Sequence, residues 1–313
     1  MAAFQLRLTA LAGALALLAT AATARTLEVG EGKEFRAPSA AAKAARDGDV
    51  VKIFAGEYFD CAVWEANRLV VEGVGDAAKV VITDKACQGK ALFITTGADV
   101  TIRNLTLTRA RVPDANGAGI RGEGARLVVE GVRFINNQNG ILTGFADGTV
   151  IVRDSVFERN GTCEKACAHG IYVGRSKLLQ VERSRFTDTR QGHHIKSRAV
   201  RTEVTGNTIV DGPDGTASYL IDVPNGGSLI VRDNTMEKGP VAENRSTAIS
   251  IGAEGVDQPT RELLIENNTF NNAGSYDTLF VTNLTATDAV VRANRITGRA
   301  KPLRGDGQVT AAR

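Results

Sequence analysis

Aromatic side chains and net charge are both scarce in this 313-residue sequence. Phe, Trp and Tyr make up only 5% of the chain while glycine occurs 33 times, so its strands must be filled by Val, Ile and Leu and interrupted often by turns. Lys and Arg number 38 against 35 acidic residues. This near balance argues against a nucleic-acid partner, because such a partner needs basic residues clustered on one face.

Long apolar runs are absent after residue 24, so we expect no membrane span, which would need about 20 apolar residues. The first residues combine Arg7, an apolar run at 8–18 and small residues that end in Ala24. This is the pattern of a cleavable secretory signal. We therefore predict a signal peptide at 1–24 and a soluble, monomeric protein that is periplasmic or secreted.

Cysteine is rare as well, with four residues in the chain. Four cysteines in an exported protein suggest two disulfides, and we expect the pairs Cys61–Cys87 and Cys163–Cys167. The alternative is that either pair binds a metal. That alternative is disfavoured because no His or second CxxC lies nearby at zinc-site spacing.

An internal repeat is the strongest feature of the remaining sequence. Its segments share alternating apolar residues followed by an Asn or Ser at a fixed position, and their spacing averages 27 residues. The segments are 100–107, 127–134, 150–157, 179–186, 202–209, 229–236, 263–270 and 289–296. One repeat corresponds to one coil of an all-β, single-stranded parallel β-helix. We expect about ten coils, which form one domain over 25–298.

The recurring Asn or Ser falls at a bend between two strands of each coil. Stacked side chains at such a bend can hydrogen-bond along the axis and satisfy backbone groups. These positions are Ser155, Ser184, Asn207, Asn234, Asn268 and Asn294. The open ends of a solenoid need covering, and the Ala-rich segment 37–46 predicts a short capping helix at the N-terminal end. The basic, polar segment 299–313 is expected to be a flexible tail.

A second strand in each coil carries an inward-facing Ile. These residues are Ile120, Ile141, Ile171, Ile195, Ile221 and Ile249. The residue after each Ile points outward and stacks about 4.8 Å from its counterpart on the next coil. This row consists of Arg121, Leu142, Tyr172, Lys196, Asp222 and Ser250. Strict alternation also turns His194 outward and His193 inward.

This row suits the removal of a proton beside the carboxylate of a uronic acid. The reaction needs a base, a cation that neutralises the carboxylate and an acid for the leaving oxygen. We expect Lys196 to be the base, which requires that Arg198 or Arg175 lower its pKa. Tyr172 or His194 would donate the proton.

Substrate binding is assigned to residues at the ends of these strands. Arg175 or Arg121 would neutralise the substrate carboxylate by bidentate pairing, and Asn225 would contact the sugar. Alternatively, Asp222 together with Asn225 or Glu254 would hold a Ca²⁺ ion that does the neutralising. No other cofactor is expected.

Four sequence blocks resemble those of exported bacterial proteins in the pectate-lyase-like β-helix superfamily. The blocks are NGAGIRGEG (116–124), HGIYVGR (169–175), GHHIKSRA (192–199) and SYLIDVPNGG (218–227). This resemblance spans residues 27–298 and implies right-handed coils. The pair Lys196-Ser197 is similar to the Lys-Ser of alginate lyases and chondroitinase B, in which the Lys is the base of a β-elimination. Those enzymes place an Arg one coil further on, where this chain has Asp222.

Three functions stay open at this point. We expect a lyase or C5-epimerase that acts on a uronic-acid-containing polysaccharide. The first alternative is a carbohydrate-binding or cell-envelope protein, in which Lys196 and Asp222 form only a structural ion pair. The second is a pectin-type hydrolase, since HGIYVG followed by HIKS is similar to motifs of polygalacturonases. Hydrolysis needs two carboxylates beside the scissile bond, and polygalacturonases carry them just before their HG motif. In this chain the strand of the coil before HGIYVG carries Leu142 and Thr143 there, so the acids are missing.

Overall fold

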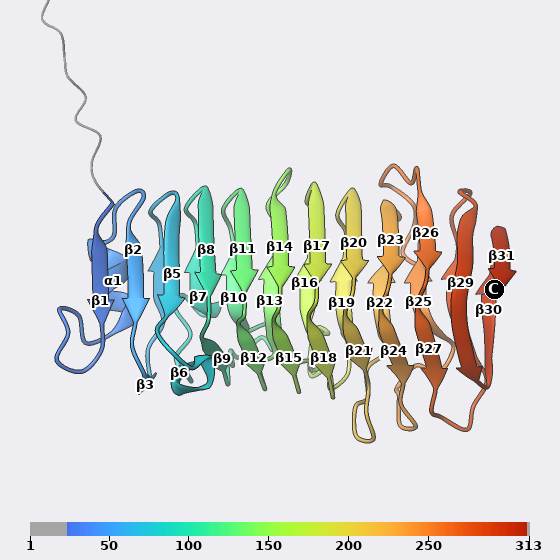
Figure 1. Cartoon of the computed structure of the whole chain (residues 1–313), viewed down its shortest axis with the longest axis horizontal. Helices are drawn as coiled ribbons and strands as arrows, with labels where there is room; N and C mark the ends of the chain where they lie inside the picture. The colour runs from blue at the N-terminus through green and yellow to red at the C-terminus, as the bar shows by residue number, and fades with distance from the viewer. Residues whose placement is uncertain (1–23, 312–313) are drawn as a thin grey trace, which may run out of the picture.

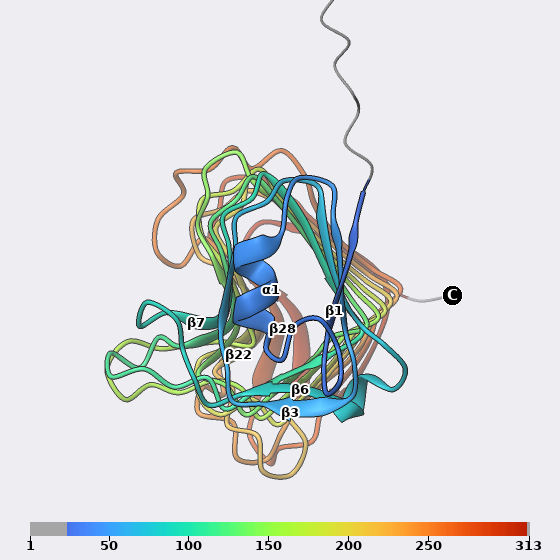
Figure 2. The same cartoon turned by 90° about the vertical axis from the view of Figure 1, so that its left-hand side faces the viewer.

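The computed structural model describes residues 24–311, so the predicted signal peptide lies outside this range except for Ala24. Short parallel strands follow one another along a single axis, from the N-terminal to the C-terminal end (Figure 1). Viewed along that axis, the coils enclose a core between three parallel sheets, which we name A, B and C (Figure 2). The predicted parallel β-helix is therefore confirmed, and sheet C, which carries the candidate site, has ten strands within the described residues.

Sheet A holds the repeat segments. Its strands are β1 Thr26–Val29, β2 Val50–Ile53, β5 Leu69–Gly73, β8 Asp99–Arg103, β11 Arg126–Glu130, β14 Thr149–Arg153, β17 Leu178–Glu182, β20 Arg201–Thr205, β23 Ser228–Arg232, β26 Leu263–Glu266, β29 Ala289–Gly298 and β31 Gly307–Ala311. Sheet B follows each of them after a bend. Its strands are β3 Gly56–Tyr58, β6 Val80–Thr83, β9 Thr106–Thr108, β12 Arg133–Ile135, β15 Val156–Glu158, β18 Arg185–Thr187, β21 Thr208–Val210, β24 Thr235–Lys238, β27 Thr269–Asn272 and the second half of β29.

Sheet C completes each coil. Its strands are β4 Ala62–Trp64, β7 Ala91–Thr95, β10 Ala118–Gly122, β13 Asn139–Thr143, β16 Ile171–Val173, β19 His193–Ser197, β22 Tyr219–Val223, β25 Thr247–Ile251, β28 Thr278–Asn283 and β30 Ala300–Arg304. Between residues 24 and 311 the helical elements are α1 Pro38–Ala44 and the short 3₁₀ helix η1 Ala77–Lys79.

Identical residue types stack from coil to coil inside the solenoid because the strands pair in register. The predicted Ile column of sheet C is fully buried throughout. In sheet B, Phe134, Phe157 and Phe186 stack with ring centroids 4.6 and 4.5 Å apart. These columns belong to one continuous apolar core that runs from Leu27 to Val291 and is the main source of stability of the solenoid.

The predicted Asn and Ser ladder lies at the bend between sheets A and B. The Asn234 Nδ2–H donates to the backbone oxygen of Val204 and to Asn268 Oδ1, both at 2.9 Å. Asn234 Oδ1 in turn accepts from the backbone and side-chain N–H groups of Asn207. Each ladder side chain thereby satisfies backbone groups that a tight bend would otherwise leave unpaired in the interior.

The two ends of the solenoid are capped differently, by a helix at the N-terminal end and by an added coil at the C-terminal end. Helix α1 lies across the N-terminal end, with Pro38 and Ala41 buried, as the cap prediction requires (Figure 2). The prediction of a flexible tail from residue 299 is wrong for 300–311. Here β30 and β31 add a last coil that pairs with β28 and β29, because the exposed edges of those strands offer a template for further pairing.

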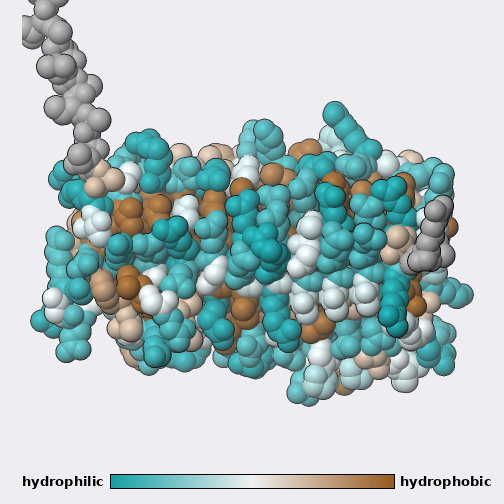
Figure 3. All heavy atoms as spheres, in the orientation of Figure 1, coloured by the Kyte–Doolittle hydropathy of each residue, from teal (hydrophilic) through white to brown (hydrophobic). Residues whose placement is uncertain are grey.

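Charged side chains cover the outer face of sheet A, and Figure 3 shows polar atoms over most of that side, with scattered apolar patches. Opposite charges alternate between neighbouring coils. Arg153, for example, lies between Glu130 at 3.6 Å and Glu182 at 3.2 Å. Such exposed pairs contribute little free energy, so this face has the character of a solvated surface.

Both predicted disulfides are confirmed. Cys61 bonds to Cys87 and Cys163 bonds to Cys167. The first disulfide links the start of β4 to the segment that leads into β7, and the second closes a short loop between β15 and β16. In residues 24–311, no helix has the length and apolarity to cross a membrane.

The Asn ladder yields a stability prediction. Asn234→Ala removes four side-chain hydrogen bonds and leaves buried backbone groups unpaired, so we expect the free energy of unfolding to fall by about 2–4 kcal/mol. Urea unfolding followed by circular dichroism measures the loss. The control is Asn271→Ala, whose side chain bonds only to other side chains at the surface, and it should cost less than about 1 kcal/mol. Equal losses in the two variants would contradict this account of the ladder.

Candidate functional site

The predicted outward row exists on sheet C. In register, Tyr172 on β16 pairs with Lys196 on β19, and Lys196 pairs with Asp222 on β22. These three strands are neighbours (Figure 1). Tyr172, Lys196 and Asp222 therefore lie side by side on successive coils, and we refer to them as the site row. Leu142 precedes them in the register and Ser250 follows them.

Lys196 makes ion pairs with two carboxylates. Its Nζ lies 3.5 Å from Asp222 Oδ2 and 2.8 Å from Glu254 Oε1. The Lys196 and Asp222 side chains are only 10% and 3% exposed, so their contact is shielded from solvent, whereas the Glu254 side chain is 45% exposed and its contact with Lys196 lies at the surface. The charges next to Lys196 are thus negative, whereas we expected cations that would lower its pKa.

Arg198 connects the row to its neighbours. Its Nε–H donates to the Tyr172 hydroxyl oxygen at 2.9 Å, and its Nη1–H donates to Asn225 Oδ1. The Nη2 atom lies 2.6 Å from Glu254 Oε2. One carboxylate, that of Glu254, is therefore shared between the ammonium of Lys196 and the guanidinium of Arg198.

A loop at 252–262, between β25 and β26, supplies Glu254 and also Asp257. We call it the acidic loop. It projects beside sheet C and is visible as the orange loop at the upper left of Figure 2. Asp257 forms an ion pair with Arg175, which follows β16 and is 82 residues away in sequence. The acidic loop thus reaches back to the coils that hold Tyr172 and Lys196.

The structure reverses our expectation for the two adjacent histidines. His194 is fully buried, with Nδ1 2.8 Å from Thr189 Oγ1 and Nε2 2.8 Å from Asp211 Oδ1, so it cannot donate a proton to a substrate on the outer face. His193 lies on the outer face, with Nε2 3.4 Å from Asp222 Oδ2. Strict alternation fails because two consecutive residues, His194 and Ile195, both turn inward.

The sequence contained a signal for this reversal. The residues that hold the position of His194 on other coils are Gly119, Gly140, Gly170, Leu220, Ala248 and Phe280, which is a set suited to a core. The position of His193 is held by Asn139 and Tyr219 on other coils, and by His169. His193 stacks between the His169 and Tyr219 rings, with centroids 4.7 and 4.9 Å apart. A comparison of the residue types at these two positions across the coils would have identified the position of His194 as the inward-facing one.

Burial controls the protonation of the groups behind Lys196. It raises the pKa of Asp222 to about 6, although the ammonium of Lys196 opposes the rise. It lowers the pKa of His193 to about 3, and Lys196 adds to that effect. Burial alone would raise the pKa of Glu254, but hydrogen bonds from Lys196 and Arg198 outweigh it, so this pKa lies below its ordinary value. Asp222 is thus the carboxyl group of the site that can change its charge in mildly acidic solution.

The tautomer of His193 follows from its partners. Its Nδ1 accepts a hydrogen bond from the backbone N–H of Tyr219 at 3.2 Å. Because its lowered pKa leaves the ring neutral, the proton is on Nε2, which points toward Asp222. His193 therefore helps to hold the carboxyl of Asp222 and has no free lone pair for a substrate.

Two further predicted roles do not fit the geometry. Arg121 lies three rungs from Lys196 in the row, about 14 Å along the axis, so it cannot neutralise the same substrate carboxylate. Asp222 and Glu254 do not form a Ca²⁺ cradle, because the Nζ of Lys196 lies against both of them. Ca²⁺ takes six to eight oxygen ligands, and no group of three or more His, Cys, Asp or Glu side chains in residues 24–311 could hold a metal.

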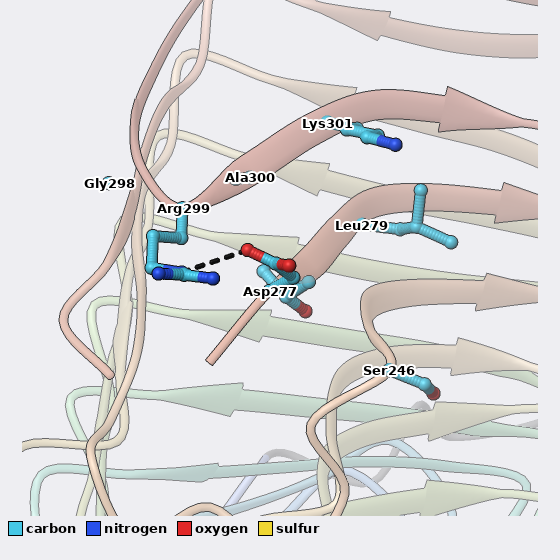
Figure 4. Close-up of a pocket in the computed structure, with 8 residues that line it drawn as sticks. Ser246, Asp277, Leu279, Gly298, Arg299, Ala300 and Lys301 are labelled. Atoms are coloured by element: carbon cyan, nitrogen blue, oxygen red, sulfur yellow. Dashed lines mark hydrogen bonds and ion pairs between the residues drawn. The ribbon is translucent and has the colours of Figure 1, made fainter. Parts of the chain in front are cut away.

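A separate hollow of about 610 Å³ lies at the C-terminal end of the solenoid (Figure 4). Lys301 and Leu279, on the last two strands of sheet C, contribute to its lining together with Ser246. Arg299 lies beside it and is bound to Asp277 at 2.8 Å. This hollow contains no member of the site row, so we treat it as separate from the candidate site.

Comparisons with known proteins agree with the architecture. The family model for the right-handed β-helix region matches residues 66–209 and 160–308. No curated protein sequence matches the chain. A solved alginate lyase from Paenibacillus sp. strain FPU-7 is 17% identical with a TM-score of 0.64, over 91% of this chain and 99% of that one.

Two other solved structures are more distant. ORF18 of Geobacillus virus E2 is 15% identical with a TM-score of 0.48, over 84% of this chain and 50% of that chain, so this protein spans half of its length. The A-module of the mannuronan C-5 epimerase AlgE4 from Azotobacter vinelandii is 15% identical with a TM-score of 0.33, over 88% of this chain and 94% of that module. Only the similarity to the alginate lyase bears on the architecture, and at 17% identity it shows the fold alone.

The raised pKa of Asp222 predicts a pH-dependent stability difference. Because the folded state holds this proton more tightly than the unfolded state, the contribution of Asp222 is present below about pH 4 and is lost as the pH rises through about 6. Compared with Asp222→Asn, the wild type should therefore lose on the order of 2–3 kcal/mol between pH 4 and pH 8. Urea unfolding of both proteins at the two pH values measures this.

Asp277→Asn provides the matched control. The hydrogen bond from Arg299 lowers the pKa of Asp277, so the contribution of Asp277 to stability is lost only as the pH falls below about 4, and the wild type and Asp277→Asn should change in parallel between pH 4 and pH 8. If the free energies of unfolding of the wild type and of Asp222→Asn change by the same amount between pH 4 and pH 8, burial does not hold the proton on Asp222.

Proposed function

Because this chain belongs to the right-handed β-helix family, we propose that the outer face of sheet C acts on an acidic polysaccharide by removing the proton beside a uronate carboxylate. This covers a polysaccharide lyase and a C5-epimerase, since both begin with the same proton and differ in whether a bond then breaks. The observation that carries the proposal is the placement of Tyr172, Lys196 and Asp222 on successive coils, with Arg198 bound to the Tyr172 hydroxyl.

Binding of the substrate carboxylate falls to Lys196 and Arg198. The carboxylate of Glu254 illustrates the arrangement, since one oxygen lies 2.8 Å from Lys196 Nζ and the other lies 2.6 Å from Arg198 Nη2. During proton removal Arg198 is the cation that stabilises the extra negative charge on the carboxylate, while Lys196, as a neutral amine, still donates a hydrogen bond to the other oxygen. The low exposure of Arg198 strengthens this effect.

Proton transfer falls to Tyr172 and Lys196. Because the Arg198 Nε–H donates to the phenolic oxygen, the Tyr172 hydroxyl proton is available for another acceptor, which suits it to protonate the leaving oxygen. Lys196 is the amine next to Tyr172 in the site row. It serves as the base after it has lost one proton to solvent, and it then takes the proton beside the uronate carboxylate and becomes an ammonium again. Asp222, buried beneath Lys196, keeps the amine aimed at the outer face.

A second candidate function is carbohydrate binding without turnover. The observation that favours it is the pairing of Lys196 with two carboxylates, because an ion pair with a purely structural role would have the same geometry. Both candidates take an acidic polysaccharide as partner. The similarity in fold to a solved alginate lyase supports that choice of substrate class.

We further propose that the protein acts as a monomer outside the cytoplasm. Two disulfides are expected of a chain that folds in an oxidising compartment. A polysaccharide with uronic acids would also be met at the cell surface or beyond it.

The decisive assay incubates the purified protein with alginate, pectate and glycosaminoglycans. Absorbance of the unsaturated uronate reports a lyase, and incorporation of solvent deuterium without cleavage reports an epimerase. Lys196→Ala should lower turnover by at least about 100-fold, which is the usual contribution of a positioned proton-transfer group. Lys52→Ala is the matched control, because this lysine pairs with Glu72 on sheet A, away from the site row, and it should leave turnover unchanged.

Two results would decide against the enzyme. If the polysaccharides bind with neither cleavage nor deuterium incorporation, the second candidate function holds. If Lys196→Ala turns over as fast as the wild type, the chemistry occurs elsewhere on the molecule.

A further inference from the structure

We propose that Glu254 and Asp257 occupy, in the unliganded protein, the positions of two carboxylates of the bound polysaccharide, and that the substrate displaces them. This inference rests on the proposed function and adds to it a substrate requirement. The ligand must carry carboxylates on nearby sugars, so that it can replace both acidic side chains. A polyuronate meets this requirement, whereas a neutral or fully esterified chain does not.

Two side chains of the acidic loop, Glu254 and Asp257, contact cations at the site. Glu254 binds Lys196 and Arg198, and Asp257 binds Arg175. Arg175 follows β16, and Lys196 and Arg198 come from the next coil, so these cations are offset by about 4.8 Å along the axis. A polymer laid along the axis would present successive acidic groups to the same cations.

Exposure indicates which partners would leave. The side chains of Glu254 and Asp257 are 45% and 44% exposed, while those of Lys196 and Arg198 are 10% and 20% exposed. Glu254 therefore lies on the solvent side of Lys196 and Arg198, whereas the pair of Asp257 with Arg175 is exposed on both sides, since Arg175 is 61% exposed. An incoming carboxylate meets Glu254 first.

Lys196 and Arg198 keep other partners when Glu254 leaves. Lys196 keeps Asp222 at 3.5 Å, and Arg198 keeps its hydrogen bonds to Tyr172 and Asn225. A substrate carboxylate would therefore enter a preorganised site, which reduces the entropic cost of binding.

The backbone of the acidic loop is fixed, so displacement needs only side-chain rotation. The backbone N–H of Glu254 donates to the oxygen of Pro224 at 2.8 Å, and those of Asp257 and Gln258 donate to the oxygen of Asn225 at 3.1 and 3.0 Å. Exposed side chains change rotamer on a picosecond-to-nanosecond timescale. Exposed ion pairs are also weak, so a polyanion can outcompete them.

The test is isothermal titration calorimetry at low ionic strength with oligomers of mannuronate and of galacturonate. Glu254→Gln and Asp257→Asn remove the competing charge while keeping the shape of the side chain. We expect each variant to bind the oligomer that the wild type prefers about three to ten times more tightly, and the double variant to bind more tightly still. The methyl esters of the same oligomers should show no such gain.

Glu262→Gln is the matched control. Glu262 belongs to the same loop and is 45% exposed, but it pairs with Arg201 on sheet A, so its removal should leave the affinity unchanged. Unchanged or weaker binding by Glu254→Gln, with a melting temperature equal to that of the wild type, would overturn the displacement. If the wild type and all variants fail to bind any polyuronate, the proposed function fails instead, and the two failures are thus distinguishable.

Discussion

In-register parallel pairing is the constraint on which the rest of this structure depends. Each strand takes its hydrogen bonds from the coils before and after it, so equivalent side chains recur about 4.8 Å apart along the axis. Inside the solenoid this spacing produces the Phe stack of sheet B and the Asn ladder at the bend after sheet A. On the outside it brings Tyr172, Lys196 and Asp222, which are far apart in sequence, into one row.

Stacking brings the charged groups together, but the loops decide how those charges are paired. In the absence of the acidic loop, Lys196 would keep only Asp222 and Arg198 would lose its carboxylate partner, and Glu254 binds both. The same pairing that stabilises the unliganded protein covers the two cations, and this is the basis of our proposal that a polyanion competes for them. Asp222 has a different role, because its burial beneath Lys196 fixes the amine from behind and raises the pKa of its own carboxyl group.

The sequence was sufficient to predict the features that follow from periodicity. The coils, the Ile column, the ladder from Ser155 to Asn294 and the site row all follow from one repeat and one alternation rule, and both disulfides were also anticipated. The errors arose where the rule breaks locally. His193 and His194 were exchanged because two consecutive residues turn inward at the start of β19, and the last coil was missed because its segment is polar. The ion pairs of Glu254 and Asp257 could not be predicted, since an irregular loop of 11 residues has no periodicity that fixes its path.

The central claim is that the outer face of sheet C, around Lys196 and Arg198, is where an acidic sugar binds. A crystal structure of the protein with a bound uronate tetrasaccharide would test it most directly. Our account predicts a sugar carboxylate within hydrogen-bond distance of Lys196 Nζ and Arg198 Nη2, with the sugar chain running across β16, β19 and β22. A tetrasaccharide bound instead in the C-terminal hollow beside Lys301, with the contacts of Lys196 unchanged, would contradict it.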